Sequence, residues 1–365
     1  MGIEEKISDI INEMNRTQKN KKTEHHLGLL KARLAKLRSE QITPKSASTK
    51  GKGFEVQKSG DARVALIGFP SVGKSTLLNR LTDTKSQTSE HEFTTLTCIA
   101  GNLNYNGATI QMLDLPGIIS GAASGKGRGR QVVAAARTAD LILMVLDPRR
   151  PQDKEILEKE LFDMRIRLNK KRPDISLTPT LSGGISITIT VKLTHLTESI
   201  IHGIVKEYKI NNCILVIRED ITDEDLIDVI SDTAVYINCL YCYNKIDNIG
   251  LEDLEKLDSP NNVLISCQKN WNLDELQDAI WEHLEMKRIY TKKKGVFPDL
   301  ETPVVIRKND TVKDLCMNIH RDFIDIFKYA LVWGRSAKHN PQKVGLNHQL
   351  SDEDVVQIYT SNVYY

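Results

Sequence analysis

Apolar residues in this chain gather in short runs separated by polar stretches, and their spacing changes from one region to the next. Continuous runs of about six apolar residues are typical of strands buried in a sheet. Mostly apolar segments of this length lie at residues 63–68, 108–113 and 237–243, and an unbroken run lies at 141–146. Helical spacing follows the segments at 63–68 and 141–146, at residues 76–81 and 154–168. Alternating strands and helices predict an α/β fold with a mostly parallel sheet and flanking helices.

A second pattern fills residues 169–236, where alternating and helical spacings follow one another. The expected elements are a strand at 185–193 with one polar face, a helix at 198–208 and a strand at 213–217. Thr222 followed by Asp225 is the signature of a further helix start. This region is therefore predicted to be a small α+β domain inserted in the larger fold.

The C-terminal residues predict another small module. A strand, a helix at 312–327 and a last strand at 354–359 are compatible with a β-grasp domain. Basic and aromatic residues gather between them, which favours either RNA contact or a loop anchored by a core tryptophan. They are Trp333, Arg335, Lys338, His339 and Lys343.

Composition places the chain among ordinary globular proteins, with 365 residues, 40% hydrophobic residues and a net charge of +2. Its longest apolar run, Leu141–Leu146, is far shorter than the ~18 residues of a membrane-spanning helix. The N-terminus lacks the apolar stretch of a secretory signal. Six scattered cysteines favour reduced thiols over a disulfide framework. We therefore expect a cytoplasmic protein with no membrane partner.

The near-neutral total conceals a basic N-terminal segment. Residues 16–52 carry eleven Lys or Arg against two acidic residues. Such an excess would attract a phosphate backbone, although charge runs also occur on solvated helix surfaces. Leucines recur there at helical spacing, at positions 27, 30, 34 and 37, which predicts an amphipathic helix.

The first apolar strand leads directly into a glycine-rich loop and a helix, the arrangement of a phosphate-binding loop. Glycines allow backbone N–H groups to point at phosphate oxygens, and the helix N-terminus adds its positive dipole end. Lys74 is expected to bridge the β- and γ-phosphates, and Ser75 to ligate Mg²⁺. The residues expected to contact nucleotide here are Gly68, Phe69, Pro70, Ser71, Val72, Gly73, Lys74, Ser75 and Thr76.

Two later strand ends select the base. Asp114 and Gly117 form a DxxG motif, in which the carboxylate would hold Mg²⁺ through water and the Gly117 N–H would meet the γ-phosphate. Residues 244–247 form an NKxD motif, whose aspartate can accept hydrogen bonds from the N1–H and 2-amino group of guanine but not from adenine. The base-binding residues expected here are Asn244, Lys245, Asp247, Ser266 and Cys267. Together the motifs predict a GTP site.

Two segments are candidates for nucleotide-dependent switches. Thr95, within Glu-Phe-Thr-Thr, is expected to ligate Mg²⁺ when the γ-phosphate is present, although a surface turn would show the same residues. The glycine-rich stretch at 117–130 suits a second switch. The residues with expected catalytic roles are Lys74, Thr95 and Gly117, and those with expected metal roles are Ser75, Thr95 and Asp114.

On these motifs the sequence resembles the developmentally regulated GTP-binding proteins, an Obg-like branch of the translation-factor-class P-loop GTPases. The resemblance is carried by GFPSVGKSTLLNRLT, EFTTLTCIAGNL, DLPGIISGAASGKGRGRQV, NKID and YALVWGRSAKHNPQKVGLNHQLSDEDVVQIY, and it spans nearly the whole chain. It is strongest to the eukaryotic cytoplasmic members that carry a TGS domain. It implies GTP hydrolysis, association with the ribosome or ribosomal RNA, and a zinc-finger regulatory partner, with the chain monomeric otherwise.

The resemblance also implies a domain order. That order is a helical, basic region at 1–58, a GTPase domain in two parts at 59–168 and 237–290, an inserted α+β domain at 169–236, and a β-grasp TGS domain at 301–365.

Two departures bear on the rate of hydrolysis. Ile118 stands where Ras-type enzymes place the glutamine that orients water, which predicts a low intrinsic rate. Ser71 stands where potassium-using relatives carry asparagine, so activation by K⁺ stays open alongside activation by a partner. The alternative to a switch enzyme is a GTP-stabilised scaffold or RNA-binding module in which hydrolysis is incidental.

Overall fold

The computed structural model describes residues 2–18, 20, 23–42, 60–82, 89–93, 96–115 and 135–361. Its contacts divide the chain into two compact units. Unit 1 comprises Met1–Glu55, Gly117–Thr138 and Pro151–Asn238, and unit 2 comprises Val56–Pro116, Ala139–Arg150 and Cys239–Tyr365. Within the described ranges, no helix has both the length and the apolar character needed to cross a membrane.

Unit 2 contains the large sheet that the apolar runs predicted. Its strands are β1 (Ala62–Ile67), β2 (Ser89–Phe93), β3 (Leu96–Tyr105), β4 (Ala108–Asp114), β5 (Leu141–Leu146), β10 (Val235–Asn244) and β11 (Asn262–Ile265). They lie in the order β11-β10-β5-β1-β4-β3-β2, and β10 begins in unit 1. The pairs β1–β4, β1–β5 and β10–β11 are parallel, whereas β3 pairs antiparallel with β4 and β2. The predicted mostly parallel sheet is confirmed.

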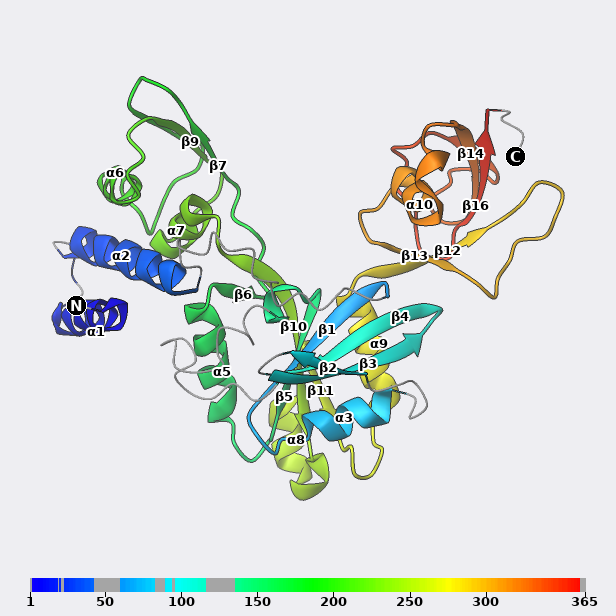
Figure 1. Ribbon diagram of the computed structural model, residues 1–365, viewed down its shortest axis with the longest axis horizontal. Coiled ribbons are helices and arrows are strands. Elements are labelled where there is room, and N and C mark those ends of the chain that lie inside the picture. The colour runs from blue at the N-terminus through cyan, green and yellow to red at the C-terminus, as the bar shows by residue number, and fades with distance from the viewer. Residues whose placement is uncertain are drawn as a thin grey trace. The chain divides into compact units, whose positions relative to one another are not determined.

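Helices flank this sheet (Figure 1). They are α3 (Lys74–Leu81), α8 (Leu251–Leu257) and α9 (Leu273–His283), with the short 3₁₀ helix η2 (Ile246–Asn248) after β10. Leu77 and Leu78 of α3 pack with strand residues such as Leu66 and Leu143 in one buried core. Because β1, β4 and β5 run parallel, the loops that follow them emerge at the same edge of the sheet.

The C-terminal part of unit 2 is a five-stranded sheet in the order β13-β12-β16-β14-β15. Its elements are β12 (Met286–Thr291), β13 (Val304–Arg307), α10 (Val312–Ile319), η3 (Arg321–Phe323), β14 (Phe327–Trp333), β15 (Gln342–Val344) and β16 (Val355–Thr360). The helix expected over 312–327 is wrong in length. Chain direction changes at His320, whose backbone is extended, and residue 327 already begins a strand.

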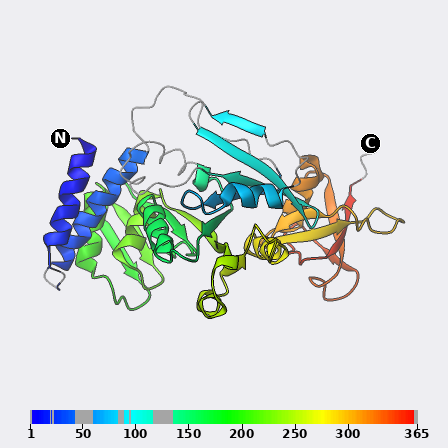
Figure 2. The same ribbon diagram turned by 90° about the horizontal axis from the view of Figure 1, so that it is seen from below.

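Unit 1 combines the N-terminal helices with the inserted region. Its elements are α1 (Ile3–Arg16), α2 (Glu24–Ile42), α5 (Gln152–Asp163), β6 (Ile166–Leu168), β7 (Ile175–Pro179), β8 (Ile185–Ile189), α6 (Glu198–Glu207), β9 (Cys213–Ile217) and α7 (Asp223–Ser231). Strands β7, β9 and β8 form a three-stranded sheet, and β6 pairs with the start of β10. Helices α1 and α2 lie side by side (Figure 2).

The inserted elements follow the sequence closely at two places. Thr222 and Asp225 form the expected capping box at the start of α7. Strand β8 alternates between half-buried and exposed residues, as its pattern predicted, but it ends at Ile189 and not at residue 193. The helix expected over 154–168 is wrong beyond residue 163, because Arg165 has a positive φ of 65° and the next three residues form β6.

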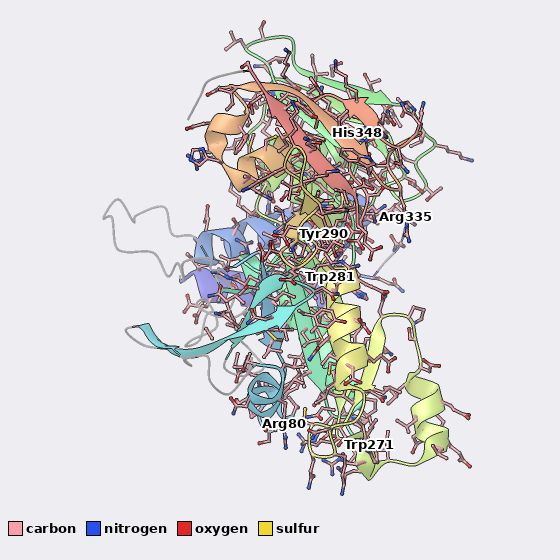
Figure 3. The ribbon with its side chains drawn as sticks, turned by 90° about the vertical axis from the view of Figure 1, so that its right-hand side faces the viewer. Arg80, Trp271, Trp281, Tyr290, Arg335 and His348 are labelled. Carbon is pink, nitrogen blue, oxygen red and sulfur yellow. The ribbon has the colours of Figure 1, made fainter. Side chains whose placement is uncertain are left out.

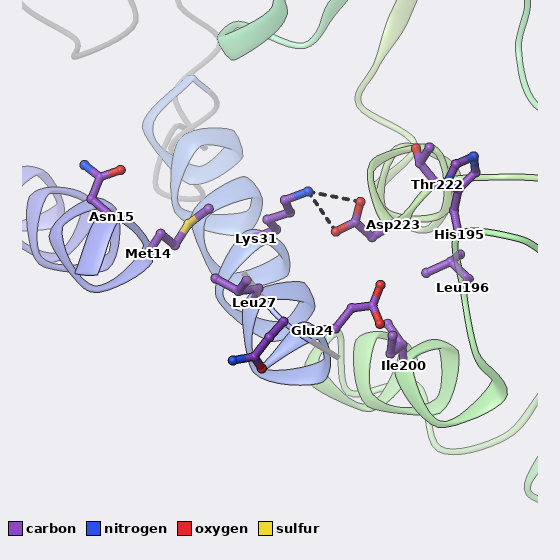
Figure 4. A pocket seen from close by; sticks show the side chains of 11 residues that line it. Met14, Asn15, Glu24, Leu27, Lys31, His195, Leu196, Ile200, Thr222 and Asp223 are labelled. Atoms are coloured by element: carbon purple, nitrogen blue, oxygen red, sulfur yellow. Dashed lines mark hydrogen bonds and ion pairs between the residues drawn. The ribbon is translucent and has the colours of Figure 1, made fainter. Parts of the chain in front are cut away.

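The amphipathic helix expected from the leucine spacing is α2, and its basic side chains have partners within unit 1. Lys31 forms an ion pair with Asp223 at the start of α7, at 2.9 Å (Figure 4). It also pairs with Glu224 at 3.5 Å. Arg33 pairs with Glu207 of α6, and Arg38 pairs with Asp163 of α5. Leu30 and Leu34 are buried beneath them. Part of the basic excess is therefore balanced by acidic residues far away in the sequence.

Candidate active site

The predicted phosphate-binding loop joins β1 to α3. Glycine is required at both of its ends, because a Cβ on Gly68 would lie 2.4 Å from the carbonyl oxygen of Val145, and one on Gly73 would lie 2.4 Å from Nδ2 of Asn244. Gly73 also has a φ of 101° at the N-cap of α3, which side chains strongly disfavour. The first N–H groups of α3 lack partners within the helix, so they are available to phosphate oxygens.

Lys74 lies across this loop and is buried. Its Nζ donates to the carbonyl oxygens of Gly68 and Phe69, both at 3.0 Å. Burial lowers the pKa of this ammonium, and the nearby Asp114 carboxylate opposes that shift. Phosphate oxygens can replace the two carbonyl groups as acceptors, and their negative charge would favour the protonated ammonium.

Ser75 and Asp114 meet at the first turn of α3. The Ser75 hydroxyl donates to Oδ2 of Asp114 at 2.5 Å. Burial raises the pKa of Asp114, while Ser75 and Lys74 oppose the rise. Two hard oxygen donors at one point fit Mg²⁺, which is usually held by one or two protein groups together with waters and phosphate oxygens. No group of three or more His, Cys, Asp or Glu among the described residues is placed to hold a metal ion, and a nucleotide-bound Mg²⁺ needs none.

Asn244, at the end of β10, ties together the loops of the site. It is buried, its Nδ2 donates to the carbonyl oxygen of Val72 at 2.9 Å, and its Oδ1 accepts from the backbone N–H groups of Lys245 and Cys267 at 2.8 and 3.1 Å. The Cys267 amide expected to face the base is therefore directed at Asn244. Asn244 therefore fixes the position of the phosphate loop relative to the loops at Lys245 and Cys267.

Asp247 and Ser266 form the base-reading end. The hydroxyl of Ser266, which is fully buried, donates to Oδ1 of Asp247 at 2.6 Å. Asp247 itself is half-buried. Among the described residues, its Oδ2 has no hydrogen-bond partner, so this carboxylate is oriented by Ser266 and is still able to accept from a base.

Sequence reasoning missed Asp147, which follows β5. Its Oδ2 lies 3.3 Å from Nζ of Lys245, whose Nζ also donates to the carbonyl oxygen of Ser71 at 2.7 Å. Arg149 donates to both oxygens of Asp147 and, with Lys245, holds the pKa of that carboxyl well below its usual range. Lys245 is thus fixed between the phosphate loop and β5. The available signal was an aspartate at the carboxyl end of a central parallel strand.

The structure brings the expected residues of the phosphate loop, Asp114 and the NKxD motif together within unit 2. Three expected residues lie outside the described ranges: Thr95, Gly117 and Ile118.

Comparison with protein families matches three parts of the chain in order. Residues 63–178 match a model described as "50S ribosome-binding GTPase", residues 182–286 the "C-terminal region of MMR_HSR1 domain", and residues 287–360 the "TGS domain".

Similarity to curated proteins covers almost the whole chain. The developmentally-regulated GTP-binding protein 2 homolog of Dictyostelium discoideum and the developmentally-regulated GTP-binding protein 2 of Homo sapiens are each 55% identical over 361 residues, which is 98% of this chain and 99% of each relative. Among solved structures, the FeoB G-domain from Methanococcus jannaschii aligns with a TM-score of 0.33 and 19% identity over 61% of this chain and 97% of that domain. That likeness is too distant to add to the assignment.

Proposed function

Because this chain belongs to the developmentally regulated GTP-binding proteins, a family of P-loop GTPases that hydrolyse GTP, we propose that it is a ribosome-associated switch acting in translation. The supporting observation is that the model described as a ribosome-binding GTPase matches residues 63–178, which contain the phosphate loop and Asp114. The proposed partners are the ribosome or its RNA and a zinc-finger regulatory protein. The proposed state is a cytoplasmic monomer in the absence of that protein.

The site supports the chemistry of such a switch through charge and position. Lys74 would neutralise the β- and γ-phosphates, while Ser75 and Asp114 would hold Mg²⁺, which offsets the charge that develops on the transferred group. Asp247 would read the guanine, and Lys245 would carry its stem along the base. Asn244 joins the phosphate loop to the loop that carries Asp247, so a base bound at Asp247 would help to hold the phosphate loop in place.

We expect hydrolysis by the protein alone to be slow, on the order of 10⁻⁴–10⁻² s⁻¹, because Ile118 cannot orient water as a glutamine does. A monovalent cation or a partner would supply the missing charge. Phosphate release in KCl and in NaCl, with and without the zinc-finger partner, separates these sources. A rise in KCl alone would assign the role to K⁺ at Ser71, and a rise only with the partner would assign it to that protein. Turnover near 1 s⁻¹ in NaCl without partner would contradict the proposal.

Ribosome binding is expected to follow the bound nucleotide. Purified protein loaded with a non-hydrolysable GTP analogue or with GDP is sedimented with ribosomes at one salt concentration, because basic residues alone give unspecific RNA binding that falls with salt. We expect more protein in the pellet with the GTP analogue. Lys74→Ala, which removes the phosphate-binding ammonium, is expected to lose that difference.

The other outcomes are equally informative. Equal binding in both nucleotide states would contradict the switch and favour a GTP-stabilised scaffold or an RNA tether. No binding in either state would contradict the ribosomal role and leave the GTPase activity as it stands.

A further inference from the structure

The C-terminal sheet of unit 2 has two unlike faces. One face packs against α10, and Ile289, Ala330, Val332 and Val356 share a buried core with Val312 and Leu315 of that helix. Since side chains alternate along a strand, the residues between them point to the opposite side. We call that side the outer face. It is formed by Tyr290, Lys292, Tyr329, Leu331, Trp333, Lys343, Val355, Gln357 and Tyr359.

Flat aromatic rings dominate the outer face. Tyr329 on β14 lies opposite Tyr359 on β16, and their rings stack with centroids 4.6 Å apart and planes 15° apart. Trp333 stands four residues further along β14, about 13 Å away at the usual rise of a strand. All three residues are half-buried, and the ring of Tyr329 supports that of Tyr359.

Lysines sit directly against these rings. Nζ of Lys343 lies 4.3 Å from the ring centroid of Tyr329, and Nζ of Lys292 lies 4.9 Å from that of Trp333. A cation held on an aromatic face is attracted by the ring and is also placed beside any group that stacks there. The outer face therefore pairs each stacking surface with a positive charge.

Positive charge extends beyond the sheet, and the neighbouring acids are already engaged. Arg335, Lys338 and His339 are exposed in the loop after β14, and the Arg335 side chain is marked in Figure 3. The acidic turn before β16 is held by bonds to Arg288, Ser351 and Ser336. Its members are Asp352 and Glu353, which pair with Arg288, and Asp354, which is buried and accepts from the Ser351 and Ser336 amides.

We propose that the outer face binds single-stranded RNA, with unpaired bases stacked on Tyr359 and Trp333 and with Lys292 and Lys343 on the adjoining phosphates. Stacking rings beside a positive groove are the means by which proteins bind unpaired strands without reading sequence. Paired bases in a duplex offer no free face to these rings. The inference rests on the proposed function, since a ribosome would supply such RNA.

Binding of a labelled single-stranded RNA decamer to the full-length protein tests this, measured by fluorescence anisotropy at one salt concentration. Tyr359→Leu keeps an apolar side chain but removes the ring, and we expect it to weaken binding by about 5- to 150-fold, the range for loss of one base stack. Tyr359→Phe keeps the ring and is expected to bind as the unaltered protein does. The same decamer annealed to its complement is expected to bind more weakly than the single strand.

Charge is tested by a matched pair of lysine variants. Lys343→Gln is expected to weaken binding and to reduce the slope of log K against log salt by about 1. Lys313→Gln removes the same charge from α10, on the other side of the sheet, and is expected to change neither.

The inference is overturned if Tyr359→Leu binds RNA as the unaltered protein does, if Tyr359→Phe is as weak as Tyr359→Leu, or if duplex and single strand bind equally. It is also overturned if the face prefers a protein-like ligand, shown by an acidic peptide displacing the decamer at lower concentration than unlabelled RNA. Ribosome sedimentation separates the two proposals. Nucleotide-dependent sedimentation without decamer binding would remove only this inference, and decamer binding without sedimentation would remove only the ribosomal role.

Discussion

Replacing Asp247 by asparagine is expected to weaken GTP binding by about 10²- to 10⁴-fold. The carboxylate would accept two hydrogen bonds from guanine, and bonds to charged groups each contribute about 1.5–3 kcal/mol. Since 1.4 kcal/mol is a factor of ten in affinity, losing both bonds gives that range. The substitution is isosteric, and Ser266 can still donate to the remaining oxygen, so the loop that carries residue 247 should keep its position.

The same change should create a new preference. The asparagine amide would present an N–H₂ donor to the base, which opposes the 2-amino group of guanine but suits the 2-oxo group of xanthine. Fluorescence titration with GTP and XTP measures both affinities. Asp253→Asn, an exposed carboxylate on α8 that pairs with Lys256, provides the matched control and should leave both unchanged. If Asp247→Asn still ranks GTP above XTP as the unaltered protein does, the base is read elsewhere.

What the sequence predicted well is local. Strands β1, β4 and β5 are mostly apolar and buried, and a mostly apolar segment of this length predicts a buried strand without knowledge of distant residues. The phosphate loop could also be predicted from the sequence. Its glycines mark it, and Gly68 and Gly73 lie so close to Val145 and Asn244 that a larger residue would collide with them. Local chemistry therefore located the site before any tertiary contact was known.

What the sequence did not reveal depends on residues that meet only in the fold. Helix α5 ends at Asp163, and Arg165 has a left-handed backbone conformation just before β6, although the helical spacing of apolar residues continues past this point. The basic face of α2 suggested a nucleic-acid surface, yet Lys31 is paired with an acidic residue 192 positions later. The role of Asp147 was not predicted, because its partner Lys245 follows a different strand and is distant in the sequence.

A buried cluster of charged residues in unit 1 could not be predicted either, because its members are far apart in the sequence. Asp228, in the last turn of α7, is almost fully buried and pairs with two arginines, Arg165 and Arg167. Arg167 uses two nitrogens, with Nε 2.5 Å from Oδ2 and a second nitrogen 2.9 Å from Oδ1 of the carboxylate. A third guanidinium, Arg137, lies nearby, and burial together with Arg165 lowers its pKa. A single carboxylate thus pairs with two buried guanidinium groups, Arg165 and Arg167.

Replacing Asp228 by asparagine is therefore expected to lower the free energy of unfolding of unit 1 by about 3–5 kcal/mol, since removing one partner of a buried ion pair leaves an uncompensated charge. For a unit of this size that corresponds to a fall of roughly 6–20 °C in Tm. Asp232→Asn is the matched control, because Asp232 follows the same helix and pairs with Arg172 at 2.8 Å while both side chains are largely exposed. An exposed pair contributes about 0–1 kcal/mol, so this variant should melt within a few degrees of the unaltered protein.

Hydrogen–deuterium exchange shows in which unit the Asp228→Asn variant loses stability. In Asp228→Asn, amides of α7 and β9 should exchange faster, while those of β1 and β5 in unit 2 should keep their protection, because Asp228 and its partners Arg165 and Arg167 belong to unit 1. Nucleotide affinity should likewise be retained, since the base and phosphate residues lie in unit 2. If Asp228→Asn and Asp232→Asn melt together, the arginines are hydrated once the carboxylate is gone, and the cluster adds specificity of packing rather than stability. A fall confined to unit 1 would show that the inserted region depends on this single buried carboxylate.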